Sequence, residues 1–136
     1  MIGGKVLDPS AVIRIVTGDS IYGQALVSVA IDAGVVLNIP ATALATAWML
    51  IPTSAHAALD ALCDVAVIVH DSLDAPAARD VGLMAATDHG DSPGSVTTLG
   101  TAHAITVARD RGWPVVTADR ELVLALDAHA TLESLP

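Results

Sequence analysis

Short apolar runs and longer segments of mixed polarity alternate along this chain of 136 residues. The clearest run is residues 65–69, and shorter ones lie at residues 6–8, 35–37 and 115–116. Runs this short, rich in valine and isoleucine, are typical of strands that are buried on both faces of a sheet. The alternation therefore predicts a parallel sheet with helices between its strands.

Prolines and glycines mark where the intervening helices begin and end. Pro9 and Pro40 suit a first helical turn, where the missing N–H is not needed. Gly18, Gly34 and Gly112 follow helical segments and suit their C-terminal ends. Helices are expected at residues 11–16, 21–32, 40–50, 53–62, 73–86, 95–111 and 121–126, with a loop at 87–94 and an edge strand at 131–132.

Length and pattern together indicate one three-layer α/β/α domain over residues 1–136, with four or five strands and helices on both faces of the sheet. No apolar stretch is long enough for a membrane span, so we expect none. The first residues lack the basic region and long apolar run of a secretory signal, and we therefore expect a cytoplasmic protein. Cys63 is the single cysteine, which excludes an internal disulfide and fits a reducing compartment.

The charge balance argues against nonspecific binding of nucleic acid. Six Lys and Arg residues face fifteen Asp and Glu residues, for a net charge of −9. Nonspecific affinity for nucleic acid comes largely from basic residues that displace counterions. The aromatic residues are Tyr22, Trp48 and Trp113, too few for a platform on which bases stack.

Two of the predicted strands end in an aspartate and a hydroxyl. Asp8 and Ser10 follow the first strand, and Thr117 and Asp119 lie at and after the end of the strand at 115–116. Ligands of open parallel sheets bind at the carboxyl ends of the strands, so neighbouring strands would place the two carboxylates together, as a metal site requires. The alternative is structural, with both aspartates as helix caps and both hydroxyls bonded to local backbone.

The order of elements and four motifs resembles the PIN-domain family, including the VapC-type toxin ribonucleases. The motifs are VLDPSA at residues 6–11, IP at 39–40, TAHA at 101–104 and VVTAD at 115–119, so the resemblance spans nearly the whole chain. It implies a metal-dependent phosphodiesterase fold, whose carboxylates hold Mg²⁺ or Mn²⁺ to activate a water and stabilise charge on a phosphate. It also implies homodimers and, for toxins, a small antitoxin partner.

The family's acidic site carries over only in part. Asp8 and Asp119 match its first and last acids, and Glu121 is an additional acid of a kind that some members carry. Thr46 stands where the family usually has a glutamate, and Thr101 stands where it usually has an aspartate. A threonine brings no negative charge, so the resemblance implies a degenerate site that holds Mg²⁺ or Mn²⁺ weakly.

Other polar residues have less specific roles. Asp88 and Asp91 in the predicted loop are remote candidates to replace the missing acids. His103 is expected as a packed or hydrogen-bonded core histidine, and Arg14 and Arg120 are candidates to face a phosphate.

Two functions of different classes remain open. The favoured one is a PIN-fold protein with weak or absent nuclease activity that serves as a binding or oligomerising module, because Thr46, Thr101 and the net charge all point that way. The alternative is an active Mg²⁺-dependent endoribonuclease toxin that acts on RNA. A homodimer is expected in both cases, since the helix with Met49 and Leu50 adds apolar surface to an already apolar chain.

Overall fold

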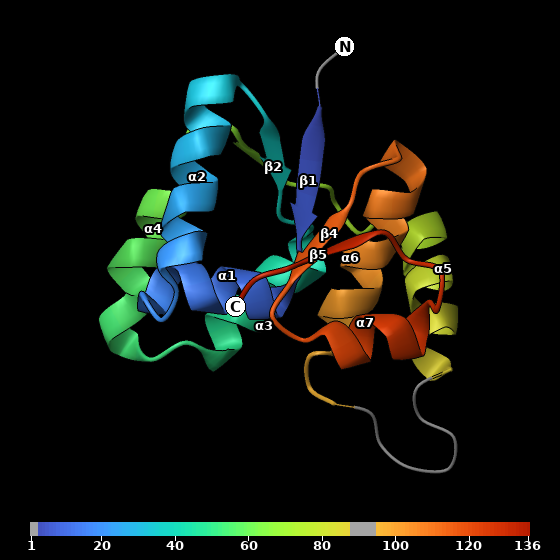
Figure 1. Ribbon diagram of the computed structural model, residues 1–136. Helices are drawn as coiled ribbons and strands as arrows, with labels where there is room; N and C mark the ends of the chain where they lie inside the picture. Colours follow the sequence, from blue (N-terminus) through green and yellow to red (C-terminus); the bar gives the residue numbers. More distant parts are fainter. Residues whose placement is uncertain (1–2, 88–94) are drawn as a thin grey trace.

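A five-stranded, entirely parallel sheet forms the centre of the computed structural model, which describes residues 3–87 and 95–136 (Figure 1). The strand order is β3-β2-β1-β4-β5, so the first strand of the chain lies in the middle. The strands are β1 (Gly4–Leu7), β2 (Val36–Asn38), β3 (Ile68–Val69), β4 (Val115–Thr117) and β5 (Leu132–Ser134). The predicted parallel sheet is confirmed.

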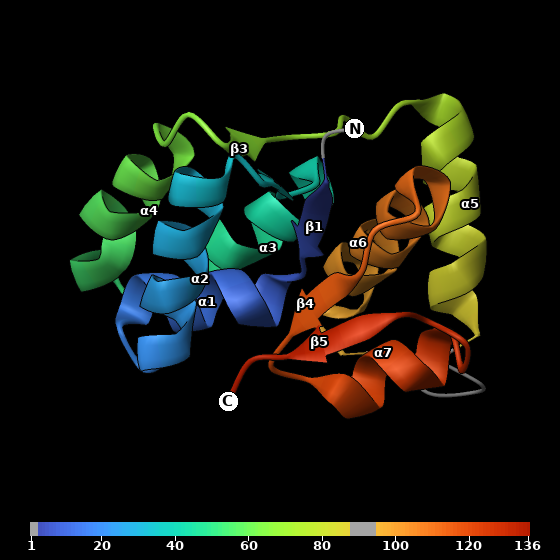
Figure 2. The ribbon, with the colours of Figure 1, turned by 45° about the horizontal axis from the view of Figure 1, so that its top comes forward.

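Helices cover both faces of this sheet, as Figures 1 and 2 show from two directions. Neighbouring residues of a strand point to opposite faces, so Leu7 and Val116 join one apolar cluster while Val6 and Val115 join the other. The first cluster packs against α1 (Pro9–Thr17), α2 (Ile21–Ala33), α3 (Ala41–Leu50) and α4 (His56–Cys63), which follows the short 3₁₀ turn η1 (Thr53–Ala55). The second packs against α5 (Ala75–Ala86), α6 (Thr98–Arg111) and α7 (Arg120–Leu126). The three-layer α/β/α architecture is therefore confirmed.

The predicted helix ends at glycine are also confirmed. Gly18, Gly34 and Gly112 each follow the last residue of a helix and adopt left-handed backbone angles, with φ of 74°, 68° and 69°. Side chains with a Cβ rarely adopt these angles, which is why glycine marks the ends.

Several predicted boundaries differ from the observed ones. Only Ile68 and Val69 of the run 65–69 form a strand, because the amide of Val65 donates to Leu62 O and that of Ile68 to Val65 O in turns that continue α4. The helix expected at 73–86 begins at Ala75, after the capping residue Asp74. The helix expected at 95–111 begins at Thr98.

Within residues 3–87 and 95–136, no helix combines the length and apolarity that crossing a membrane requires.

Candidate functional site

Asp8 lies at the carboxyl end of β1 and is completely buried. Its Oδ1 accepts a hydrogen bond from Ser10 Oγ at 2.7 Å and one from the amide of Ala11 at 2.9 Å, so it is the N-cap of α1. Its Oδ2 is also buried and has no hydrogen-bond partner among residues 3–87 and 95–136. Buried polar atoms are normally paired, so Oδ2 is the atom of this edge that fits a ligand.

The surroundings of Asp8 make it a weak acid. Its pKa is raised from 3.8 to about 6: burial is the main cause, the charge of Asp119 adds to it, and the hydroxyls of Thr117 and Ser10 and the amide of Ala11 act in the opposite direction. At neutral pH most molecules therefore carry a buried carboxylate with one unpaired oxygen.

Ser10 and Thr117 join the end of β1 to the end of β4. Ser10 Oγ accepts the amide of Ala118 at 2.8 Å, and it lies 3.3 Å from Thr117 Oγ1. Thr117 Oγ1 accepts the amide of Asp119 at 2.8 Å. Thr117 thus bonds to local backbone, as in the structural alternative, whereas Ser10 bonds to the backbone that follows β4 and so ties the start of α1 to that edge of the sheet.

Asp119 has an exposed side chain and caps the next helix. Its Oδ1 accepts the amide of Leu122 at 3.2 Å, at the start of α7, and Glu121 is exposed in the first turn of that helix. The strands β1 and β4 pair directly, with Leu7 opposite Val116, so both aspartates lie at the same edge. Helix capping and a shared edge occur together here, although the sequence presented them as alternatives.

Thr46 of α3 and Thr101 of α6 are both buried. A Cβ at Gly100 would lie 2.6 Å from Pro9 Cγ and 2.8 Å from Thr46 Oγ1, so α6 approaches α1 and α3 closely at this glycine. Gly100, the neighbour of Thr101 in the sequence, therefore packs against Thr46 and against the residue that follows Asp8. Gly100 was missed from the sequence, where its one signal is a glycine inside a predicted helix.

The donor set for a metal is small. Among the described residues, no three His, Cys, Asp or Glu side chains gather closely enough to hold an ion. Mg²⁺ and Mn²⁺ prefer several oxygen ligands, and here Asp8 Oδ2 and the exposed Asp119 are the carboxylate donors of the edge. Asp88 and Asp91 lie outside the described residues.

His103 is buried on α6, as expected of a core histidine. Its Nδ1 accepts the amide of Thr42 at 3.3 Å and lies 3.0 Å from Thr42 Oγ1. Burial lowers its pKa, while the charge of Asp71 and the backbone of Ser72 raise it. The neutral ring therefore satisfies a backbone N–H in the first turn of α3, the helix that carries Thr46.

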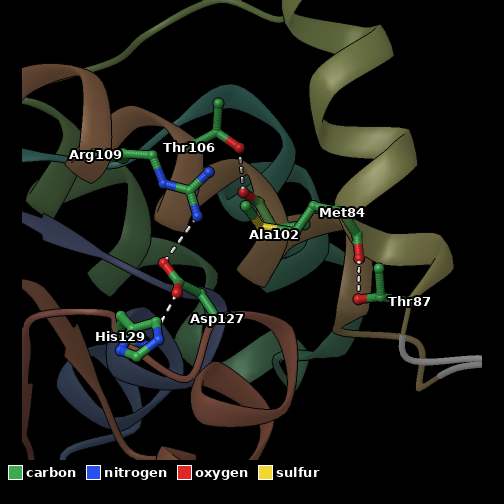
Figure 3. A network of polar contacts seen from close by, with 7 residues as sticks. All are labelled: Met84, Thr87, Ala102, Thr106, Arg109, Asp127 and His129. Atoms are coloured by element: carbon green, nitrogen blue, oxygen red, sulfur yellow. Dashed lines mark hydrogen bonds and ion pairs between the residues drawn. The ribbon is translucent and has the colours of Figure 1, made fainter.

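A second network fixes α7 against α6 (Figure 3). Arg109 Nη2 donates to Asp127 Oδ2 at 2.8 Å, and the amide of His129 donates to Asp127 Oδ1 at 3.0 Å. These bonds hold the C-terminal end of α7, whereas Asp119 caps its N-terminal end. Arg14 and Arg120 form no ion pair within the described part of the chain.

Several solved structures are similar to this chain in fold. A chain of VapBC2 from Rickettsia felis, bound to a DNA fragment from the promoter, is 13% identical, with a TM-score of 0.68 over 98% of this chain and 99% of that chain. A chain of FitAB bound to an IR36 DNA fragment is 17% identical, with a TM-score of 0.56 over 96% of this chain and 94% of that chain. Neither protein-family models nor curated protein sequences match this chain. At these identities the likeness is one of fold, and the fold is PIN-like.

Proposed function

We propose that this chain is a PIN-fold protein of the toxin–antitoxin type whose nuclease site is degenerate and which acts as a binding and oligomerising module. The observation that supports the proposal is that Thr46 and Thr101, which stand where the family usually has acids, are buried, while Asp8 is the buried carboxylate among the described residues. A hard dication binds according to the number and charge of its oxygen ligands, so this site holds Mg²⁺ or Mn²⁺ weakly.

Each residue of the edge has a role in this proposal. A bound dication supplies an activated water and stabilises charge on a phosphate. Asp8 offers its unpaired Oδ2 to the ion, Asp119 offers the second carboxylate, and Glu121 is the additional acid. Ser10 and Thr117 fix the positions of both aspartates through the backbone of residues 118–119.

The binding role is supported by surface and by charge. Ile21, Tyr22 and Val29 of α2 are large apolar side chains that are more than half exposed. A net charge of −9 attracts a basic partner, and both similar folds come from two-component assemblies bound to DNA. We infer a small antitoxin-like protein as the partner.

Restoration of the acids tests the proposal. Thr46→Glu with Thr101→Asp rebuilds the expected acids, and the wild type should show little Mg²⁺- or Mn²⁺-dependent cleavage of RNA while the double variant shows more. Circular dichroism must first show both proteins folded, because Thr46 lies against Gly100 and the new carboxylates repel Asp8 when no metal is bound.

The second candidate is an active Mg²⁺-dependent endoribonuclease toxin. The buried, unpaired Asp8 Oδ2 favours it, because two carboxylates suffice for Mg²⁺ when substrate phosphates complete the ligand set. Strong metal-dependent cleavage by the wild type, abolished by Asp8→Ala, establishes this alternative and rejects the degenerate site.

A further inference from the structure

The strand β5 forms one edge of the sheet, as Figure 2 shows. In a parallel pair, alternate residues direct their N–H and C=O groups to the neighbouring strand. The amide of Val115 donates to the carbonyl of Thr131 at 2.9 Å, which sets this alternation. The N–H and C=O of Leu132 and Ser134 therefore point away from β4, and no described residue pairs with them.

An apolar hollow of about 450 Å³ lies beside this edge. Tyr22, Leu26 and Val29 of α2 line one side, and Val116 and Leu135 line the other. Tyr22 is 59% exposed and Val29 is 62% exposed, so the apolar surface continues out of the hollow along α2. An unpaired strand edge next to an apolar hollow is the arrangement to which extended peptides bind.

The charges of the hollow are balanced locally. Glu133 is the charged side chain of the lining, and Lys5 Nζ binds both of its carboxylate oxygens, at 2.6 and 2.9 Å. The hollow is thus suited to apolar side chains, whereas the chain as a whole carries a charge of −9. That charge attracts a cationic segment.

We propose that β5 pairs with an extended segment of a cationic partner protein, which adds a sixth strand to the sheet. Backbone bonds to Leu132 and Ser134 hold the segment, and its alternate apolar side chains enter the hollow beside Tyr22 and Val29. Its basic residues remain in solvent and match the charge of the chain. This inference rests on the proposed binding function and names the chemistry of the partner.

A peptide of alternating lysine and valine, with both ends blocked, is the probe. Its binding to the full chain should slow hydrogen exchange at the amides of Leu132 and Ser134. The double variant Tyr22→Ser, Val29→Ser should weaken binding about tenfold, since it removes apolar surface from the hollow. Leu83→Ser is the matched control, because Leu83 is similarly exposed on α5, and it should leave the affinity unchanged.

Several outcomes overturn the inference. These are absence of binding, binding that leaves the β5 amides unprotected, equal binding of the double variant, and equal binding of a glutamate–valine peptide. Concentration-dependent protection of the same amides without peptide also overturns it, by assigning the edge to a second copy. RNA cleavage tests the proposed function separately, so an active nuclease that binds the peptide rejects that function alone.

Discussion

Burial changes the acidity of two side chains near the candidate site, in the direction that favours the uncharged form of each. The pKa of Asp8 is raised to about 6, and the pKa of His103 is lowered. Their hydrogen bonds differ, because Asp8 keeps one oxygen unpaired while Nδ1 of His103 accepts the amide of Thr42. The aspartate is thus available to a ligand, and the histidine holds a helix in place.

The first prediction concerns Asp8 and pH. Its folded pKa lies above the unfolded value, so its stabilising contribution is fully present below about pH 4 and is lost as the pH rises through about 6. The free energy of unfolding of the wild type is compared with that of Asp8→Asn in the presence of a metal chelator. The difference between the two proteins should fall by up to about 3 kcal/mol as the pH rises from about 4 to neutral. Urea unfolding measures this, and parallel curves for the two proteins would refute it.

His103 should show the opposite dependence. Its pKa is lowered in the folded protein, so stability is present above the unfolded pKa of 6.5 and is lost as the pH falls below it. His103→Asn keeps an acceptor near the position of Nδ1 and should reduce this acid sensitivity. His103→Leu leaves the amide of Thr42 unpaired and should cost about 1–2 kcal/mol at neutral pH in the same assay. Equal stability of the leucine variant and the wild type at neutral pH would exclude the capping role.

At the scale of elements, the close approach of α6 to α3 and α1 organises the site. Gly100 makes this contact possible, because its Cβ would lie within 3.1 Å of Pro9, Thr46 and Ala43. Helix packing therefore sets the distance between Thr46, Thr101 and the end of β1.

A matched pair of glycine variants tests this contact. Gly100→Ala should destabilise the protein by about 1–3 kcal/mol, because the added methyl group meets the Cα of Ala43 and cannot be accommodated without a shift of the backbone. Gly82→Ala on α5 meets nothing within 4 Å and should stabilise it by about 0.5–1 kcal/mol through helix propensity. Thermal unfolding measures both changes. A Gly100→Ala variant as stable as the wild type would show that the helices shift to make room for the methyl group.

The elements show how far sequence reasoning extends. Glycine ends helices because of its backbone freedom, so the helix ends at Gly18, Gly34 and Gly112 could be predicted. Each aspartate follows a predicted strand, so the shared edge of Asp8 and Asp119 could be predicted as well. The prediction for the run 65–69 was wrong because apolar residues in a turn have the same composition as a strand. The unpaired Oδ2 of Asp8 and the contact at Gly100 depend on which elements meet, which spacing along a chain does not encode.

At the scale of the whole molecule, three surfaces serve different roles in the proposals. The carboxyl edge of the sheet carries the aspartates, and the β5 edge carries unpaired backbone groups. The end of α3 carries Met49 and Leu50, which are 62% and 41% exposed. These two side chains mark the surface where we place the homodimer contact.

The homodimer is the last prediction. Light scattering at tens of micromolar should give twice the mass of the chain, and Met49→Glu should give a monomer because it buries a charge in the contact. Tyr22→Glu is the control: it places the same charge at an exposed residue of another helix, and this variant should remain dimeric. A monomeric wild type would contradict the prediction.

The central position of β1 also bears on how the chain folds during synthesis. During synthesis β1 pairs with β2 soon after both are made, but its other neighbour is β4, where Val6 pairs with Val115 more than a hundred residues later. Until α6 and β4 have been made, the face of β1 that carries Val6 and the backbone groups that pair with β4 remain uncovered. Pairings this distant in sequence form slowly and leave intermediates prone to aggregate. We therefore expect refolding to be limited by docking of the C-terminal third of the chain.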